Sequence, residues 1–264
     1  MTEKIFQASD IEVTFKVGKG RNRSLVHALK GVSLDVNHGE IVGLVGESGS
    51  GKSTMARVIV GLQSYSAGSL TYAGSPVPEH RTLEDRRKIQ MVFQDPYSSL
   101  DPRMTVRQTI TELLKAHAIV TPQEYLPRCK ELLSLVKLPE SLLENRPYGM
   151  SGGQRQRVAI ARALSLNPQF LIADEAVSAL DVSVQASIIN LLADLRETLN
   201  LSILFISHDL AIVRQLCDRV SVINQGEIVE SSPTLALFDN PQNAYTQQLI
   251  SAVPKLDAIV RNAN

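Results

Sequence analysis

Short apolar segments separated by longer stretches of helical periodicity dominate the hydrophobic pattern of the chain. The four clearest are IVGLV at 41–45, IQMVF at 89–93, QFLIA at 169–173 and SILFIS at 202–207. Apolar segments of this length predict strands buried on both faces, as in a parallel sheet. Polar or glycine-rich residues follow each of them at once. Because ligands bind beyond the carboxyl ends of the strands in open α/β sheets, we expect these four strand ends to converge on one site.

Other patterns predict strands and hairpins beside this sheet. Alternating residues at 11–15 predict a half-buried strand, residues 31–37 predict another that is followed by a tight turn, and residues 68–74 predict a third. A hairpin is predicted around Gln225–Gly226. The predicted fold class is therefore α/β, with an N-terminal antiparallel β-subdomain next to a mostly parallel sheet.

Residues 95–158 differ from the rest of the chain, because prolines punctuate segments that have helical periodicity. Helices with periodic apolar positions are predicted on both sides of this segment, near 52–62 and 183–199. The pattern predicts an α-helical subdomain inserted into the α/β fold. The sequence from 232 onward has a mixed pattern that predicts no single element.

The end of this helical segment reads YGMSGGQRQRVAIARAL and predicts an amphipathic helix from Gln154 onward, with Ser151 as its N-cap. Two glycines, Gly152 and Gly153, lie at the entrance to the helix, where ordering them costs more conformational entropy than ordering most residues. A backbone without Cβ atoms at a helix N-terminus can approach a phosphate closely. This helix start is therefore a candidate phosphate contact.

Composition and charge limit the classes of protein to which the chain can belong. Among its 264 residues, 27 Lys and Arg balance 27 Asp and Glu, which argues against a dedicated nucleic-acid binder. No apolar segment reaches the roughly 18 residues of a membrane-spanning helix, and the first residues lack the pattern of a signal peptide. Cys129 and Cys217 lie far apart, which argues against a disulfide framework. We expect a cytosolic protein that can dock on a membrane partner.

The segment GESGSGKST at 46–54 matches the phosphate-loop pattern G-x-x-x-x-G-K-[ST] and lies between a predicted strand and a predicted helix. Glycines let the backbone wrap around phosphates, with N–H groups pointing at the anion. Lys52 would reach the terminal phosphates, and the Ser53 hydroxyl would bind Mg²⁺. The predicted nucleotide-binding residues of this loop are Gly46, Ser48, Gly49, Ser50, Gly51, Lys52, Ser53 and Thr54.

Polar side chains end the other three predicted strands. FLIADE at 170–175 places Asp174 and Glu175 at a strand end, where Asp174 would hold Mg²⁺ through water and Glu175 would orient or deprotonate an attacking water. Gln94 can orient water or bind Mg²⁺ through its carbonyl, and His208 can hydrogen-bond a terminal phosphate. The predicted metal ligands are Ser53, Gln94 and Asp174.

These motifs, in this order, resemble the ATP-binding subunits of ABC transporters. SGGQ at 151–154 matches the family signature, although the commonest form has Leu where Met150 stands. The phosphate loop, Gln94, FLIADE, SALD at 178–181 and His208 match the Walker A, Q-loop, Walker B, D-loop and H-loop. The resemblance covers about residues 5–235 and implies a P-loop NTPase (RecA-like) core, with two cassettes that enclose two ATP molecules head to tail.

The resemblance also implies roles for residues at matching positions. Ser151, Gly152, Gly153 and Gln154 would face the γ-phosphate held by the partner cassette. Glu175 would be the catalytic base, His208 a γ-phosphate clamp, and Gln94 a γ-phosphate sensor linked to the membrane partner.

Three further positions follow from the same resemblance. Asp181 would contact the partner across the dimer. Phe15 is a candidate for stacking on adenine, and an inward-facing core residue is the alternative. Ala176 stands where many members have Pro, a change that removes no catalytic group, so we expect activity to survive.

A finer resemblance points to the oligopeptide, dipeptide and nickel importer branch. It rests on FQDPYSSLDPRMTV at 93–106, DEAVSALDVSVQA at 174–186 and NPQNAYTQQLISAVP at 240–254. It implies two permeases, a second and different ABC ATPase, and an extracytoplasmic solute-binding protein, with the chain peripheral on the cytoplasmic face of the membrane. The implied domains are a nucleotide-binding domain at 1–235 and a C-terminal extension at 236–264.

Within the branch, the segment Tyr97–Met104 is expected to face the permease. Some members carry a four-cysteine iron–sulfur site, and this chain lacks the cysteines, so we expect no such cluster.

Other functions remain open on the sequence alone. A soluble ABC ATPase of DNA repair or chromosome structure would carry a long coiled coil between Gln94 and Ser151, and too few residues separate them for that. A small-molecule kinase on a P-loop fold would make SGGQ accidental. An ABC exporter subunit is a variant of the transporter hypothesis, and the C-terminal pattern argues against it. The basic segment 16–23 predicts a solvated hairpin loop better than a nucleic-acid site.

Overall fold

The computed structural model describes residues 3–18, 24–95, 99–178 and 180–252. Several predicted features fall outside these ranges. They include Tyr97 of the expected permease contact, Ala179 of the SALD motif, much of the basic segment 16–23, and residues 253–264 of the predicted C-terminal extension.

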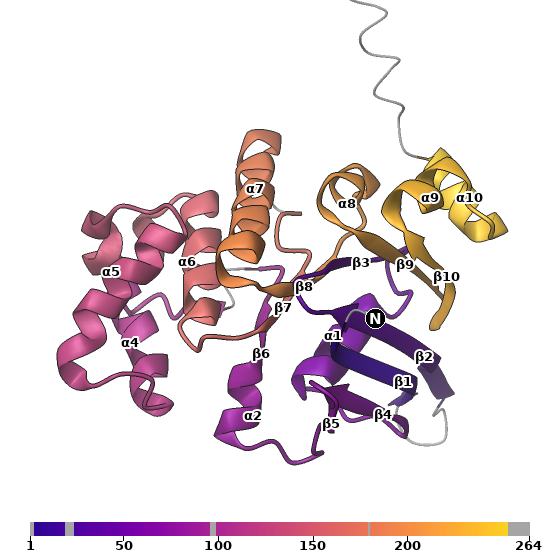
Figure 1. Ribbon diagram of the computed structural model, residues 1–264, viewed down its shortest axis with the longest axis horizontal. Helices are drawn as coiled ribbons and strands as arrows, with labels where there is room; N and C mark the ends of the chain where they lie inside the picture. Colours follow the sequence, from indigo (N-terminus) through magenta and orange to yellow (C-terminus); the bar gives the residue numbers. More distant parts are fainter. Residues whose placement is uncertain (1–2, 19–23, 96–98, 179, 253–264) are drawn as a thin grey trace, which may run out of the picture.

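A six-stranded sheet forms the centre of the molecule, and its strands lie in the order β10-β9-β3-β8-β7-β6 (Figure 1). The strands are β3 (Ile41–Val45), β6 (Ile89–Val92), β7 (Phe170–Asp174), β8 (Ser202–Ile206), β9 (Arg219–Asn224) and β10 (Glu227–Pro233). All pairs are parallel except β10 with β9. The four apolar segments therefore form neighbouring parallel strands, and the prediction that their carboxyl ends meet at one edge is confirmed.

A second, antiparallel sheet has the order β2-β1-β4-β5, with β1 (Lys4–Val17), β2 (Ser24–Asn37), β4 (Ala67–Tyr72) and β5 (Ser75–Pro76). Strand β1 is much longer than the predicted 11–15. The alternation is interrupted at Asp10, which has a φ of 53° and receives the Ser33 hydroxyl on its carboxylate at 3.2 Å. Gly68 faces this bulge, since a Cβ there would lie 2.5 Å from the carbonyl oxygens of Ser9 and Asp10.

Helix α1 (Lys52–Val60) packs into the core between the two sheets. Its buried residues Met55 and Ile59 belong to one apolar cluster with Phe6 of β1 and Phe170 of β7, whose ring centroids are 5.1 Å apart. Alternate residues of β3 face this cluster, and the others face a second cluster on the opposite side of the sheet. The parallel sheet is thus covered on both faces, as its apolar strands require.

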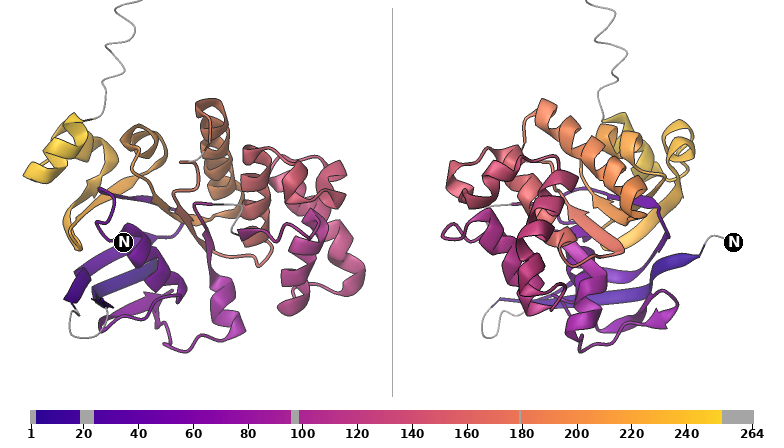
Figure 2. Two further views of the ribbon diagram at one scale, coloured as in Figure 1. Left: turned by 180° about the vertical axis from the view of Figure 1, so that it is seen from behind. Right: turned by 60° about the vertical axis from the view of Figure 1, so that its left-hand side comes forward.

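Helices cover the second face and extend the molecule at one end, on the left in Figure 1 and, seen from behind, on the right in the left view of Figure 2. They are α4 (Val106–Ala116), α5 (Tyr125–Leu135), α6 (Gly152–Leu164), α7 (Val182–Leu199) and α8 (Leu210–Leu216), with 3₁₀ turns at Pro122–Glu124, Glu140–Glu144 and Pro147–Gly149. The short helix α2 (Leu83–Lys88) lies directly before β6 and buries none of its residues. A helical segment therefore does follow β6. Its predicted boundary at residue 158 lies inside α6 and stays a prediction.

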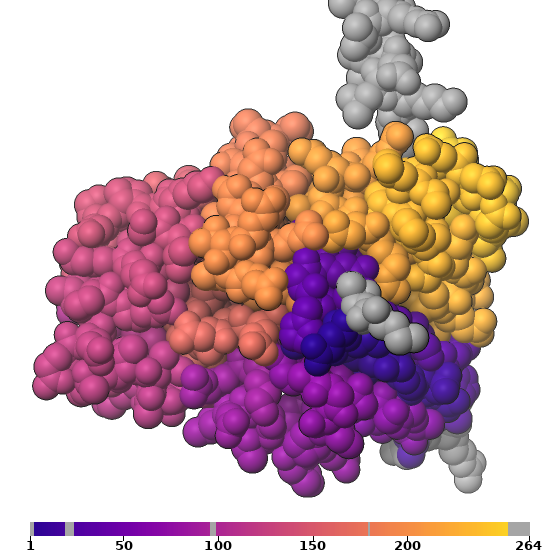
Figure 3. Space-filling view, in the orientation of Figure 1, coloured from indigo at the N-terminus to yellow at the C-terminus, as the bar shows by residue number. Residues whose placement is uncertain are grey.

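The C-terminal residues form α9 (Thr234–Asp239) and α10 (Ala244–Ser251), at the end of the molecule opposite the α4–α6 group (Figures 1 and 3). Leu237 of α9 is buried in the main apolar cluster, so this helix packs against the body of the fold. The predicted domain boundary after residue 235 falls within α9. Among the described residues, no helix combines the length and apolar character needed to cross a bilayer.

Candidate nucleotide-binding site

The phosphate loop joins β3 to α1 and lies against neighbouring backbone. A Cβ at Gly51, where φ is +118°, would lie 2.8 Å from the Ala28 carbonyl oxygen, and one at Gly46 would lie 2.1 Å from the Ile223 carbonyl oxygen. Only glycine fits at such distances. At Gly49, by contrast, a Cβ would meet nothing within 4 Å. The loop is therefore supported by β2 and β9 at its two ends and open at Gly49 between them.

The Lys52 side chain folds back onto the loop. Its Nζ donates to the carbonyl oxygens of Gly46 at 2.7 Å and Glu47 at 2.8 Å, and the side chain is only 5% exposed. Burial lowers the pKa of Lys52, and the negative charges of Glu175 and Asp174 oppose this shift. Two of the three ammonium N–H groups are thus used to position the charge at the loop, which leaves one for a phosphate.

The β9–β10 hairpin braces the loop from outside. Its turn residues Gln225 and Gly226 both have positive φ, 47° and 86°, as a two-residue hairpin turn of this kind requires. The Gly226 N–H donates to the Ser50 carbonyl oxygen at 2.9 Å, and the Gly226 carbonyl oxygen accepts from Lys30 N–H at 2.8 Å. The predicted hairpin is confirmed, but its contact with the phosphate loop was not foreseen.

Ser53 and Asp174 form an oxygen-rich pair beside the loop. The Ser53 hydroxyl donates to Asp174 Oδ1 at 3.3 Å, and Asp174 is buried at the end of β7. Burial raises the pKa of Asp174, while the Ser53 hydrogen bond opposes the rise. The described residues hold no cluster of three or more His, Cys, Asp or Glu that could bind a metal. A divalent cation at this pair would therefore need further oxygen ligands, which a bound triphosphate supplies.

Three candidate catalytic side chains meet at the ends of β6, β7 and β8. Gln94 Nε2 donates to Glu175 Oε2 at 2.8 Å, and His208 Nδ1 lies 3.5 Å from Glu175 Oε1. Glu175 is 18% exposed and His208 is 61% exposed, so the imidazole stands at the open side of the carboxylate. Sequence reasoning predicted this convergence from strand ends alone.

Glu175 also has an unusual backbone. Its φ is +46°, and its N–H donates to the Ile206 carbonyl oxygen of β8 at 2.9 Å. Left-handed conformations of non-glycine residues are costly and persist where the surroundings impose them. The conformation turns the chain sharply at the end of β7 and places the carboxylate between Gln94 and His208.

The SGGQ segment caps α6. The Ser151 hydroxyl accepts from Gln154 N–H at 3.2 Å, and the Gln154 side chain accepts from Ser151 N–H at 2.9 Å, a reciprocal capping box. Because of this cap, α6 begins at Gly152, earlier than the predicted Gln154. None of these residues hydrogen-bonds to residues 46–54 of the described chain, so a single copy does not join its signature to its own phosphate loop.

The two signature glycines have a packing role inside the chain. A Cβ at Gly153 would lie 2.5 Å from Val184 Cγ1 of α7, and one at Gly152 would lie 3.0 Å from Leu180 Cδ2. Sequence reasoning explained these glycines by a phosphate alone. The close approach of α7 is a second reason, which the local sequence does not reveal.

Asp181 and Phe15 are the two remaining residues that the sequence predicted for the site. Asp181 is exposed at the N-cap of α7, and its side chain makes no capping hydrogen bond. Phe15 lies on β1 opposite Val26 and is 36% exposed. Phe15 is therefore not an inward-facing core residue. Its stacking on adenine stays a prediction.

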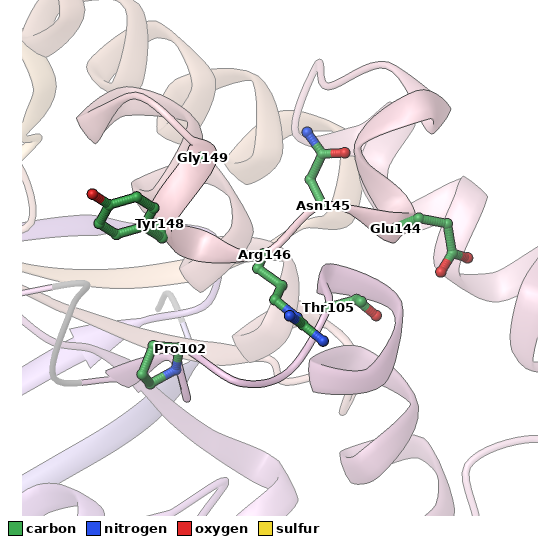
Figure 4. A pocket seen from close by; sticks show the side chains of 7 residues that line it. All are labelled: Pro102, Thr105, Glu144, Asn145, Arg146, Tyr148 and Gly149. Atoms are coloured by element: carbon green, nitrogen blue, oxygen red, sulfur yellow. The ribbon is translucent and has the colours of Figure 1, made fainter.

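A surface hollow lies between the start of α4 and the segment that precedes the signature. It is lined by Pro102, Thr105, Glu144, Asn145, Arg146, Tyr148 and Gly149 (Figure 4). Its two walls are joined where Val106 N–H donates to the Asn145 carbonyl oxygen at 3.0 Å and Arg107 Nε meets Glu144 Oε1 at 2.7 Å. The segment that follows Gln94 is therefore tied to the segment that precedes the signature.

Comparison with known proteins decides the family. The ABC transporter family model matches residues 29–178, which include the phosphate loop, Gln94, the signature and Glu175. The chain belongs to the ABC transporter family.

Relatives extend the match beyond residue 178. The oligopeptide transport ATP-binding protein OppF of Lactococcus lactis is 42% identical over 267 aligned positions, covering 99% of this chain and 84% of OppF. A dimeric ABC cassette, MJ0796 with ADP and phosphate, has a TM-score of 0.74 at 30% identity, covering 87% of this chain and 98% of that one. The cassette cbiO1 of Clostridium perfringens has a TM-score of 0.79 at 26% identity, covering 98% and 99%. As an ABC cassette, the chain is an ATPase with a P-loop NTPase core.

A first prediction concerns the packing of the signature helix in the ABC cassette. Gly153→Ala places a Cβ against Val184 Cγ1, and we expect the free energy of unfolding to fall by about 1–3 kcal/mol. Adding Val184→Ala should recover most of the loss, because it removes the clashing methyl group. Denaturant unfolding of the nucleotide-free protein measures both. Gly149→Ala is the control, since a Cβ there meets nothing within 4 Å; an equal loss in the control would contradict the packing role.

A second prediction concerns the hairpin brace. Gly226→Ala puts a Cβ 2.8 Å from the Ala28 carbonyl oxygen at a φ of +86°, which should displace the N–H that holds Ser50. We expect ATP affinity to fall about three- to tenfold, the effect of one weakened hydrogen bond.

The control for the brace is Gly74→Ala. It has a similar φ of +75°, but its Cβ meets nothing within 4 Å, so it should lower stability and leave ATP binding unchanged. Titration with a fluorescent ATP analogue compares the two variants. Equal affinities for both would show that the hairpin does not brace the loop.

Proposed function

We propose that this chain is the ATP-hydrolysing subunit of an ABC importer for peptides or a similar small solute, such as a dipeptide, an oligopeptide or a nickel chelate. The observation that carries the proposal is its similarity, over almost its whole length, to an ATP-binding protein named for oligopeptide transport. The match includes the C-terminal residues, which pack against the body of the fold through α9. The chain would work at the cytoplasmic face of the membrane as a peripheral subunit.

Hydrolysis in this proposal centres on Glu175. Its carboxylate accepts a proton from the attacking water, and Gln94 and His208 hold it from two sides. Lys52, already bound to two loop carbonyl oxygens, directs its remaining N–H toward the terminal phosphates. His208, on the exposed side of Glu175, would hydrogen-bond the γ-phosphate.

The residues beside the loop fit a Mg²⁺ ion bound together with ATP. The Ser53 hydroxyl, the Asp174 carboxylate and the Gln94 side-chain carbonyl are oxygen donors of the kind that Mg²⁺ prefers. When bound, the ion would neutralise charge that develops on the phosphates. Asp174 is buried next to Ser53, so it is held in place before any ligand arrives.

A dimer of cassettes completes the site in this proposal. Ser151, Gly152, Gly153 and Gln154 start a capped helix that makes no hydrogen bond to the chain's own phosphate loop. A related cassette is a dimer in its complex with ADP and phosphate. Head-to-tail pairing would bring this helix start to the partner's γ-phosphate and bring Asp181 to the dimer contact. The second cassette is expected to be a paralogue.

Two permeases would be moved by the cassettes during the ATPase cycle, and an extracytoplasmic solute-binding protein would supply the solute to them. The surface hollow of Figure 4 is a suitable contact because its walls join the segment after Gln94 to the segment before the signature. Tyr148 at its edge is 92% exposed, an uncommon position for a large aromatic side chain. Movement at Gln94 on loss of the γ-phosphate would be transmitted through this hollow.

A non-transport ABC ATPase fits the fold less well. The described part of 95–158 forms short helices around an apolar cluster, where such proteins would carry a long coiled coil.

The catalytic assignment predicts that Glu175→Gln abolishes turnover. The amide keeps the shape of the side chain but takes up no proton, so kcat should fall at least about 100-fold, with ATP still bound. Phosphate release measures this in an assembly that contains no second competent ATPase. Glu197→Gln, an exposed change on α7, should keep wild-type activity. Full turnover of Glu175→Gln would refute the role.

The importer assignment predicts the partners recovered from membranes. Purification of the tagged chain from gently solubilised membranes of its own host should yield two multi-span permeases and a second, different ABC ATPase. Tyr148→Ala should reduce recovery of the permeases, whereas Leu235→Ala, an equally mild change at an exposed residue of α9, should not. Recovery of soluble partners only would overturn the transport function and leave the ATPase assignment standing.

A further inference from the structure

The C-terminal helix touches the phosphate loop. The Tyr245 hydroxyl of α10 accepts a hydrogen bond from the backbone N–H of Glu47 at 3.1 Å, across 198 positions of sequence. Glu47 is the second residue of the loop, and its own carbonyl oxygen binds Lys52. The contact therefore joins the C-terminal helix to the residues that hold the phosphate-binding ammonium.

Helix α10 is anchored firmly enough for this contact to be specific. The Glu230 carboxylate of β10 accepts from the N–H groups of Gln242 at 2.9 Å and Asn243 at 3.0 Å. Burial raises the pKa of Glu230, but hydrogen bonds to the carboxylate, these two among them, lower it overall, so the carboxylate stays charged. The Asn243 side chain in turn caps α10 by accepting from Tyr245 N–H at 2.8 Å. The start of α10, including Tyr245, is thus bound to the edge strand of the central sheet.

The geometry of one peptide unit links Tyr245 to Lys52. The Gly46 carbonyl and the Glu47 N–H belong to the same planar peptide group and point in opposite directions because the bond is trans. The carbonyl accepts from Lys52 Nζ at 2.7 Å, and the N–H donates to Tyr245 at 3.1 Å. Rotation of this plane would break both hydrogen bonds together. A hydroxyl on the N–H side therefore keeps the carbonyl directed at Lys52.

We propose that Tyr245 is a positioning residue for ATP binding, which acts through the Gly46–Glu47 peptide to hold Lys52 at the mouth of the phosphate loop. Helix α10 is then part of the nucleotide site. The proposal rests on the chain being an ABC ATPase and is independent of the transported solute. Any partner or ligand that displaces α10 would lower the affinity for ATP without touching the nucleotide.

The test is Tyr245→Phe in the full-length chain, which removes the hydroxyl and keeps the ring. The Kd for ATP and the KM of the ATPase should rise about three- to tenfold, as for one lost hydrogen bond, while kcat stays within about twofold. Backbone hydrogen–deuterium exchange in the nucleotide-free protein should become faster at Glu47, because its acceptor is gone. A purely structural role would also speed exchange at Glu47 and lower the thermal midpoint, but it would leave the Kd for ATP and the KM unchanged.

Two further variants make the result decisive. Tyr72→Phe is the matched control. Tyr72 lies on β4 of the antiparallel sheet, and its hydroxyl donates to Gln169 Oε1 at 2.8 Å rather than to the phosphate loop. The KM of this variant should equal that of the wild type. Glu230→Gln weakens the anchor of α10 and should raise KM in the same direction as Tyr245→Phe. Unchanged ATP affinity in Tyr245→Phe, or an equal change in Tyr72→Phe, would overturn the proposal. Neither result bears on peptide import, which is tested by the partners recovered from membranes.

Discussion

The close packing of the phosphate loop between the two sheets is the constraint on which the rest of the site depends. Carbonyl oxygens of Ala28 on β2 and Ile223 on β9 stand where Cβ atoms would lie at Gly51 and Gly46. A loop placed this tightly cannot shift without moving both sheets. The ends of the loop are thereby fixed, and its N–H groups are oriented before a nucleotide binds. Preorganised donors of this kind need no rearrangement when the anion arrives.

The same edge of the sheet positions the acidic groups by different means. Asp174 continues β7 and is buried, so the fold holds it directly. Glu175 leaves the strand in a left-handed conformation and is held through its side chain by Gln94 and His208. Because Gln94 and His208 are more exposed than Asp174, the carboxylate of Glu175 can exchange them for water. A fixed metal-side carboxylate and an adjustable basic carboxylate suit the two tasks proposed for them.

The chemistry of the site could be predicted from the sequence because it lies at the ends of strands. Strands β3, β6, β7 and β8 are short and mostly apolar, and parallel pairing leaves one way for their ends to meet. The length of β1 could not be predicted, since the bulge at Asp10 breaks the alternation. The contact of Gly226 with Ser50 and the contact of Tyr245 with Glu47 also could not be predicted from the sequence. Their partners are far away in sequence, and neither residue carries a local pattern that points to a nucleotide.

The two glycines of the signature, Gly152 and Gly153, have a packing role in addition to the role for which the motif is recognised. As phosphate contacts they would need only an open approach from the partner cassette. Within the chain, Gly153 also allows α7 to approach α6, with Val184 where a side chain would otherwise lie. Asp181, the residue expected to meet the partner, is the N-cap of α7. Small residues at 152 and 153 would therefore satisfy two requirements at once: they leave the helix start open to the proposed phosphate contact, and they allow the close approach of α7, whose N-cap is Asp181. A loss of ATPase activity on changing Gly153 cannot by itself separate these requirements, whereas the compensating change at Val184 can.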